Sequence, residues 1–161
     1  MKRVFTMIAV AVVALAGSGL MLAQGKADVK PLDGTWKLNP ANSKFSPGPA
    51  PKSQTIKYET QGDTWKVSSD TVNADGTTGH LTYTAKFDGK ENPVTGDPDR
   101  DSATLKRIDA YTTEVVGTKA GKPTVTYRRV LSKDGKTLTL RETGTDGKGQ
   151  KVNNIQVYDK E

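Results

Sequence analysis

The 161-residue chain contains no cysteine and a single histidine, His80. Disulfide bonds and thiolate chemistry are therefore excluded, and so is a zinc site built from several cysteines and histidines. A hydrolytic triad would have to use His80, and no serine after residue 25 lies in a nucleophile-elbow pattern. We interpret His80 as a surface strand residue and expect a protein that is not an enzyme and has no cofactor.

Clustered carboxylates are also scarce, apart from Asp97, Asp99 and Asp101. Their alternate spacing is found in calcium loops, but an EF-hand also needs glycine at its sixth position and glutamate at its twelfth. This chain has Ser102 and Ile108 there. We therefore predict a surface turn and no metal. A carboxylate pair for glycoside hydrolysis is defined by distance in space, so the sequence leaves that chemistry open.

Long hydrophobic runs occur only near the N-terminus. Two basic residues precede the apolar stretch 4–16, and small residues follow it. The stretch is shorter than the ~20 residues that a membrane-spanning helix needs. We predict that residues 1–25 are a cleaved signal peptide, with a cut after Ala27 as the alternative. Residues 26–161 would form one exported domain, periplasmic or extracellular, without an integral membrane segment.

Charge of one sign is not concentrated anywhere in the chain. Removing residues 1–25 takes two of the 24 basic residues and none of the 18 acidic ones, which leaves a net charge of +4. Only Lys106-Arg107 and Arg128-Arg129 interrupt the mixture. Interspersed charge is typical of solvated strand faces and differs from the basic patch of a nucleic-acid-binding protein. We predict no nucleic-acid partner and expect a monomer.

Hydrophobic residues alternate with polar ones at the period of β-strands. The clearest stripes with a shared face are Ile56/Tyr58, Trp65/Val67/Ser69, Leu81/Tyr83/Ala85/Phe87, Val125/Tyr127/Leu131 and Leu138/Leu140. A short edge strand is expected near Pro93. Ile108 breaks the alternation that starts at Ala103 and indicates a bulge.

Asp-Gly pairs separate these strands at Asp75, Asp88, Asp134 and Asp146. Asp-Gly favours tight hairpins, in which both central residues can need a positive φ. One strand and one turn fill the intervals from Asp75 to Asp88 and from Asp134 to Asp146, so successive strands should pair antiparallel. The chain is therefore predicted to be all-β, an up-and-down meander of eight to ten strands. Such a meander is expected to close into a barrel, because closure removes exposed strand edges.

The N-terminal part of this domain holds two special segments. Trp36 follows Gly34 at the start of the first strand and is predicted to be a buried plug of the barrel. Asn39 is expected to cap one helical turn begun by Pro40. The proline-rich stretch 46–52 then forms an ordered loop, with Phe45 tucked under the barrel.

Two motifs carry a resemblance to a known family. Gly34-Thr35-Trp36 resembles the Gly-x-Trp opening of lipocalins and fatty-acid-binding proteins, together called calycins. The segment 154–160 is similar to the closing strand of the fatty-acid-binding branch. The chain also resembles uncharacterised bacterial secreted proteins with a Gly-Thr-Trp-x-Leu-Asn start and a Val-Tyr-x-Lys end. The resemblance implies a lipocalin/fatty-acid-binding-protein-like barrel and no established activity.

The chain departs from that branch at two points. The branch has a helix pair after its first strand, which the proline-rich loop replaces here. It also has an Arg-x-Tyr on its last strand that holds the ligand carboxylate, where this chain has Gln156 and Tyr158. Arg129 or Arg141 would compensate if either points inward. Alternation sends residues 155 and 157 to the core, whereas the resemblance sends Gln156 and Tyr158 inward.

Two functions follow from these observations. The first is an exported lipocalin-like carrier that binds a small hydrophobic or amphiphilic ligand inside the barrel. The alternative is an envelope or extracellular interaction protein, or an inhibitor, with a filled barrel and working surfaces at 46–52 and 97–101. For the carrier, the predicted ligand-binding residues are Trp65, Tyr83, Phe87, Tyr127, Arg129, Arg141, Gln156 and Tyr158.

Overall fold

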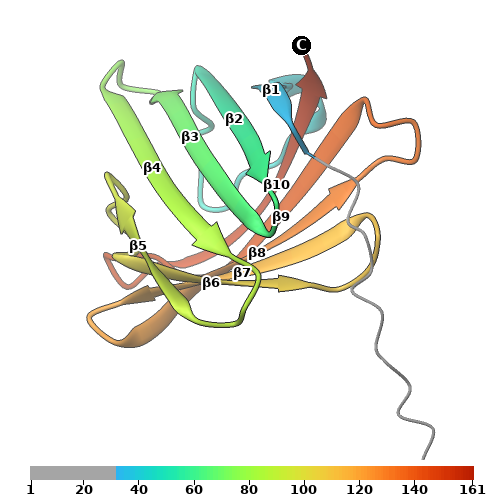
Figure 1. Ribbon diagram of the computed structural model, residues 1–161. Coiled ribbons are helices and arrows are strands. Elements are labelled where there is room, and N and C mark those ends of the chain that lie inside the picture. Colours follow the sequence, from blue (N-terminus) through green and yellow to red (C-terminus); the bar gives the residue numbers. More distant parts are fainter. Residues whose placement is uncertain (1–31) are drawn as a thin grey trace, which may run out of the picture.

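A closed barrel of ten antiparallel strands makes up the computed structural model, which describes residues 32–161. Each strand pairs with its neighbours in the sequence, and the last pairs with the first (Figure 1). The predicted up-and-down barrel is confirmed, whereas the predicted signal peptide 1–25 lies outside the described residues. The strands are β1 (Gly34–Leu38), β2 (Ser53–Gln61), β3 (Thr64–Val72), β4 (Thr78–Lys86), β5 (Glu91–Thr95), β6 (Ser102–Arg107), β7 (Thr112–Lys119), β8 (Lys122–Leu131), β9 (Thr137–Thr145) and β10 (Lys151–Lys160).

The segment after β1 has no helix pair and stays beside β10. Asn39 caps a single 3-10 turn, η1 (Pro40–Asn42), as predicted. The Asn39 N–H then donates to the carbonyl of Val157 at 2.8 Å, and the Lys44 N–H donates to the carbonyl of Ile155 at 2.7 Å. This segment therefore extends the pairing of the short strand β1 along β10. None of the helices in residues 32–161 has the length and hydrophobicity to span a bilayer.

The Asp-Gly turns form through the aspartate side chains. Each Oδ1 accepts a hydrogen bond from the N–H two residues ahead, at 2.9–3.1 Å (Thr77, Lys90, Lys136 and Lys148). Glycine takes a positive φ at Gly76, Gly89 and Gly135, but no aspartate does. The expectation that both residues could need a positive φ is therefore wrong for these pairs, because the carboxylate stabilises an ordinary turn with one left-handed glycine. Ala120-Gly121, with φ of 50° and 74°, has both residues in that region.

Two local predictions about strand irregularities are wrong. Ile108 lies beyond the end of β6, where its N–H donates to Thr112 O at 3.0 Å, so it belongs to a turn and not to a bulge. The register shifts instead in β7, between Val116 and Thr118. At Gly117, between them, a Cβ would lie 2.9 Å from Cδ of Arg100. β5 is not an edge strand either, because it pairs with both β4 and β6.

One half of the barrel interior is packed. Trp36 is fully buried, and its Nε1 donates to the carbonyl of Leu32 at 2.7 Å. Trp65 packs edge-to-face between Tyr58 and Phe87, with ring centroids 5.4 and 4.6 Å away. Leucine and valine side chains from β1 and from β6 to β9 complete this half (Leu38, Leu105, Val115, Leu131 and Leu138). The predicted plug role of Trp36 agrees with this burial.

Gly96 offers a test of the close packing between β4 and the loop after β5. It has a φ of +83°, and a Cβ there would lie 1.9 Å from the carbonyl oxygen of His80. We expect Gly96→Ala to lower the free energy of unfolding by at least about 2 kcal/mol, since backbone strain and a clash add up. Gly89→Ala is the matched control, because Gly89 also has a positive φ but open space around it. Its expected loss is about 1 kcal/mol, and equal losses in urea unfolding would contradict the packing argument.

Candidate binding cavity

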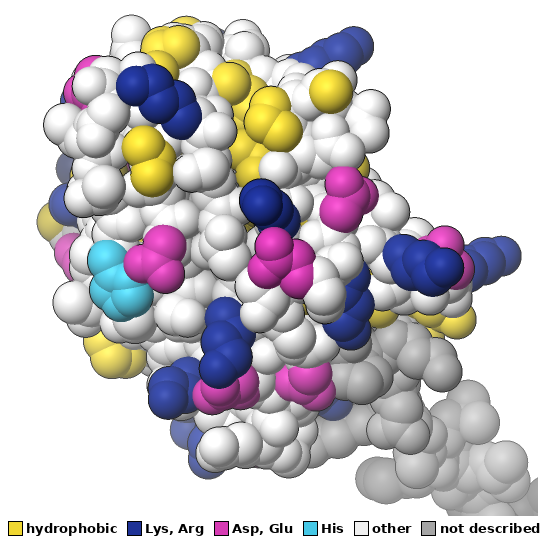
Figure 2. Space-filling view, turned by 90° about the horizontal axis from the view of Figure 1, so that it is seen from above, with side chains coloured by type: hydrophobic (Ala, Val, Ile, Leu, Met, Phe, Trp, Pro, Cys, Tyr) yellow, Lys and Arg dark blue, Asp and Glu magenta, His cyan; other side chains and the backbone are white. Residues whose placement is uncertain are grey.

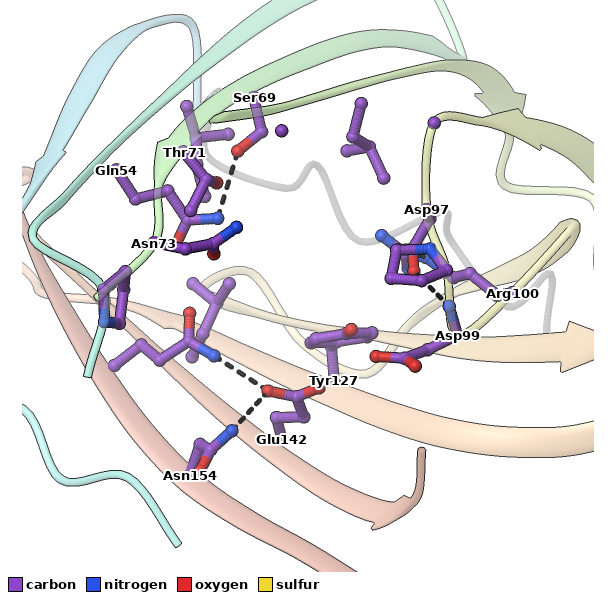
Figure 3. A pocket seen from close by; sticks show the side chains of 18 of the residues that line it. Gln54, Ser69, Thr71, Asn73, Asp97, Asp99, Arg100, Tyr127, Glu142 and Asn154 are labelled. Atoms are coloured by element: carbon purple, nitrogen blue, oxygen red, sulfur yellow. Dashed lines mark hydrogen bonds and ion pairs between the residues drawn. The ribbon is translucent and has the colours of Figure 1, made fainter. Parts of the chain in front are cut away.

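A cavity of about 590 Å³ occupies the other half of the barrel interior (Figure 3). Its volume lies within the ~300–1,000 Å³ of typical small-molecule sites. The β3–β4 and β9–β10 turns and the segments before β2 and after β5 surround its outer end, and Tyr58, Tyr83 and Arg129 line its inner part. Phe45 also lines the cavity, in agreement with its predicted place under the barrel. The interior is therefore neither fully packed nor fully hollow.

Strand register brings the polar residues of the cavity together. On β8 and β9, every second residue points inward, which includes Tyr127, Arg129, Leu140 and Glu142. Tyr127 pairs with Glu142 across the two strands, and Glu142 pairs with Asn154 on β10. Side chains directly opposite each other on one face lie about 4.5–5.5 Å apart at Cβ. The pairing therefore forms a continuous inner row over three strands.

The inward face of β10 agrees with the family resemblance. Gln156 and Tyr158 are buried and line the cavity, whereas Ile155 and Val157 lie on the other face. The hydrophobic alternation suggested the opposite arrangement. It failed because the segment 39–46 runs beside β10, so the outer residues 155 and 157 are half-buried as well.

Arg129 is the central charged group of the cavity. Its side chain is buried, with the residue 4% exposed. Nε donates to the hydroxyl of Tyr58 at 3.0 Å, and Nη2 donates to the hydroxyl of Tyr83 at 3.2 Å. Its Nη1 has no hydrogen-bond partner, and within residues 32–161 no carboxylate forms an ion pair with it.

The two tyrosines turn this arrangement into a cluster of donors. Burial raises the pKa of Tyr58, so its hydroxyl keeps its proton. Each hydroxyl accepts from Arg129 and so has its own proton left to donate. Nη1 of Arg129 and the hydroxyls of Tyr58 and Tyr83 are therefore three donors around one fixed positive charge. We call Arg129, Tyr58 and Tyr83 the donor cluster.

A second buried arginine comes from the segment between β5 and β6. Arg100 is 5% exposed, and its Nε pairs with Oδ2 of Asp97 at 2.6 Å. Its guanidinium carbon lies 4.7 Å from the ring centroid of Tyr127, and that of Arg129 lies 5.8 Å from the same centroid. Nη1 of Arg100 has no partner either. Both guanidinium groups therefore lie near the ring of Tyr127, each with one buried nitrogen whose hydrogen-bonding capacity is unused.

The three carboxylates of the Asp97–Asp101 segment have separate structural partners. Asp97 pairs with Arg100, Asp99 accepts from the Gly147 N–H at 2.8 Å, and Asp101 accepts from the Ala120 N–H at 2.9 Å. The described part of the chain contains no group of three potential metal ligands. The prediction that this whole segment is a surface turn is therefore wrong for Arg100 and Asp97, whose side chains are buried at the end of the barrel.

A chain of hydrogen bonds follows the wall opposite Arg100 (Figure 3). Gln54 Nε2 donates to Ser69 at 3.1 Å, and the Tyr158 hydroxyl lies 2.5 Å from Oε1 of Gln54 and 2.6 Å from Oε1 of Gln156. Oε2 of Glu142 accepts from Gln156 Nε2 at 2.9 Å and from Asn154 Nδ2 at 2.8 Å. We call the six residues of this chain the polar wall: Gln54, Ser69, Glu142, Asn154, Gln156 and Tyr158.

Glu142 is the buried acid of the polar wall and makes stability depend on pH. Burial raises its pKa above the ordinary value of 4.5, although a hydrogen bond from Asn154 opposes the shift. The carboxyl group of Glu142 therefore keeps its proton to a higher pH in the folded chain than in the unfolded chain. The contribution of Glu142 to stability is fully present below about pH 4.5 and is lost as the pH rises through the raised pKa.

Glu142→Gln removes this titration. Between about pH 4 and about pH 8, we expect the free energy of unfolding of the variant to rise relative to that of the native chain as the pH increases. Urea unfolding across that range measures the difference. Glu91→Gln is the control, because Glu91 is exposed on β5. A pH-independent difference between the native chain and Glu142→Gln would contradict the burial of a titrating carboxyl.

The structure brings five of the eight predicted binding residues to the cavity: Tyr83, Tyr127, Arg129, Gln156 and Tyr158. Trp65 and Phe87 belong to the packed half instead. Arg141 is exposed and pairs with Arg128 and Ile155 on the outer face of the barrel. His80 is exposed as predicted, with Nδ1 2.6 Å from Asp70.

Several lining residues were not predicted from the sequence, above all Tyr58, Arg100 and Glu142. Glu142 continues the inward face of Leu138 and Leu140, so the alternation of β9 contained the signal. Tyr58 was assigned to a core face and could have been included. Arg100 lies between strands, and no periodicity indicates its direction.

A solved structure has a similar fold. The crystal structure of zebrafish ileal bile acid-binding protein in complex with cholic acid matches with a TM-score of 0.50 and 11% sequence identity, over 80% of this chain and 98% of that chain. No family model and no curated protein matches this sequence. The resemblance to bacterial secreted proteins stays a prediction. The chain has the closed, ten-stranded antiparallel barrel of the lipocalin and fatty-acid-binding-protein type.

Proposed function

We propose that this protein is an exported carrier, without catalytic activity, that binds one small amphiphilic organic anion in the barrel cavity. The observation that carries the proposal is the donor cluster of Arg129, Tyr58 and Tyr83. It offers three hydrogen-bond donors and a positive charge without a carboxylate to balance them.

Burying a guanidinium without an anionic partner is costly, because the lost hydration is not replaced. A carboxylate, sulfonate or similar group entering the cavity would supply the missing acceptors, and charge-assisted hydrogen bonds of this kind are the strong ones. Apolar side chains from β2, β3, β4 and β9 line the same cavity and suit a hydrocarbon portion (Ile56, Val67, Leu81 and Leu140). The family's arginine is missing from β10, and Arg129 on β8 supplies a comparable charge.

The alternative of an interaction protein with a filled barrel has less support. The cavity argues against a filled interior. On the face seen in Figure 2, basic and acidic side chains are interspersed, with hydrophobic side chains gathered mainly toward its upper edge. In residues 32–161 the exposed large hydrophobic side chains are Ile108 and Val130.

Two measurements test the proposal. Native mass spectrometry of the protein from an expressing bacterium should show a co-purifying small molecule, and its intact mass should show whether the leader has been removed. Isothermal titration of ligand-stripped protein with decanoate should give one binding site per chain. A clean mass without adducts, together with no heat from decanoate or cholate, would refute the carrier function.

A further inference from the structure

We infer that the ligand is a hydroxylated organic acid, whose anionic group meets the donor cluster and whose hydroxyl groups meet the polar wall. This inference rests on the proposed function and specifies its ligand class. It separates the expected ligand from plain fatty acids, which offer a carboxylate and an unbroken hydrocarbon chain.

The polar wall lies along the path that a ligand would take from the outer end of the cavity to Arg129. Glu142 is two residues along β9 from Leu140, which pairs with Arg129. Two residues along a strand and one step between strands place the Cα atoms of Arg129 and Glu142 about 8 Å apart. A ligand anchored at Arg129 therefore passes Glu142 near the middle of a ten-carbon chain.

The polar wall needs donors from the ligand more than it needs apolar contact. Glu142 is 8% exposed, its Oε2 accepts hydrogen bonds from Asn154 and Gln156, and the Tyr127 hydroxyl is directed to the same carboxyl. A carboxylate has about four acceptor positions on its two oxygens. The Tyr158 hydroxyl lies within hydrogen-bond distance of Oε1 of both Gln54 and Gln156. It has one proton, so it can donate to only one of these two oxygens at a time. Ligand hydroxyl groups would supply these missing donors.

A plain alkyl chain would do the opposite. It would remove water from Glu142, Asn154 and Gln54 without replacing the hydrogen bonds, which is unfavourable for buried polar groups. The apolar lining residues lie among polar ones, because Ile56 and Leu81 flank Ser69 across β2, β3 and β4, and Leu140 precedes Glu142 on the inner face of β9. The lining therefore matches a ligand whose hydrocarbon skeleton carries hydroxyl groups along its length.

The test compares decanoate with monohydroxydecanoates, which share its chain length and carboxylate. With the ligand-stripped native chain, at least one isomer with a mid-chain hydroxyl is expected to bind about tenfold more tightly than decanoate in isothermal titration. In Glu142→Gln this preference should disappear, because the amide that replaces the carboxylate offers fewer acceptor sites. Arg141→Gln, one residue away on the outer face, is the matched control and should keep the preference.

The outcomes separate the inference from the proposed function. Equal affinity of the native chain for decanoate and for every hydroxylated isomer would overturn the inference and leave the carrier function standing. Absence of binding by all of them would overturn both. The comparison on the native chain is valid whether or not Glu142→Gln folds. Asn154→Ala, at a half-buried position, is a second variant that should reduce the preference for the hydroxylated isomer.

Discussion

Arg129→Met is expected to weaken decanoate binding by about 100-fold or more. The substitution removes the charge and one of the three donors of the cluster, and it withdraws the two hydrogen bonds that orient Tyr58 and Tyr83. Truncating a buried charged partner of this kind typically costs about 2–5 kcal/mol of binding free energy. Isothermal titration of the ligand-stripped variant against the native chain measures the loss.

The same substitution should leave the free protein folded. Arg129 is buried without a carboxylate partner, so methionine, which has a similar length and no charge, relieves an unfavourable burial. We expect the free energy of unfolding in urea to stay within about 1 kcal/mol of the native value or to rise. Loss of binding together with loss of folding would not fit a ligand-binding role for this charge.

Arg141→Met is the control for this experiment. Arg141 is exposed on the outer face of β9, so neither affinity nor stability should change measurably. Undiminished decanoate affinity in Arg129→Met, or a comparable loss in Arg141→Met, would contradict the assignment of the donor cluster.

Trp36→Ala is expected to lower the free energy of unfolding by about 3–5 kcal/mol. Trp36 is fully buried between β2 and β10, where its backbone pairs with Ile56 and Lys160. Removing the indole leaves a large void and deprives the Leu32 carbonyl of its donor. Urea unfolding followed by circular dichroism measures the change, and a value near zero would refute the structural role of the side chain.

Trp36→Phe separates the two contributions of the indole. It keeps most of the apolar volume but loses the hydrogen bond to Leu32, so a smaller loss of about 1–2 kcal/mol is expected. Trp36 does not line the cavity. Decanoate affinity at a temperature where Trp36→Phe is folded should therefore remain native, which distinguishes packing from binding.

Strand pattern and turn chemistry were readable in the sequence for specific reasons. The alternation of Leu81, Tyr83 and Ala85 has one polar and one apolar face because one side of a barrel strand meets the interior. The Asp-Gly pairs were readable as turns because an aspartate carboxylate and a left-handed glycine both act locally. The inward direction of Arg129 also followed from the alternation of Val125 and Tyr127, and the same alternation places Arg141 on the face opposite Leu138 and Leu140, where it lies.

Other features depend on segments that are distant in the sequence. The face of β10 was ambiguous because the segment 39–46 runs beside this strand and the outer residues Ile155 and Val157 are half-buried, whereas Gln156 on the inner face is buried. Arg100 gave no periodic signal, since its direction depends on Asp97 and on the room left by Gly117 in β7.

The amino-acid sequence by itself determined an all-β barrel of sequentially paired strands, because alternation and turn formation are local properties. It also determined which chemistry was missing, through the absence of cysteine and the single histidine. Only the tertiary structure decided that one half of the barrel is packed and the other hollow, since this depends on how side chains from ten strands fill a shared volume. It also decided that Arg129 meets Tyr58 and Tyr83 without a carboxylate. Closure of the barrel brings Arg129 into contact with Tyr83, which is 46 positions away in the sequence, and with Tyr58, which is 71 positions away.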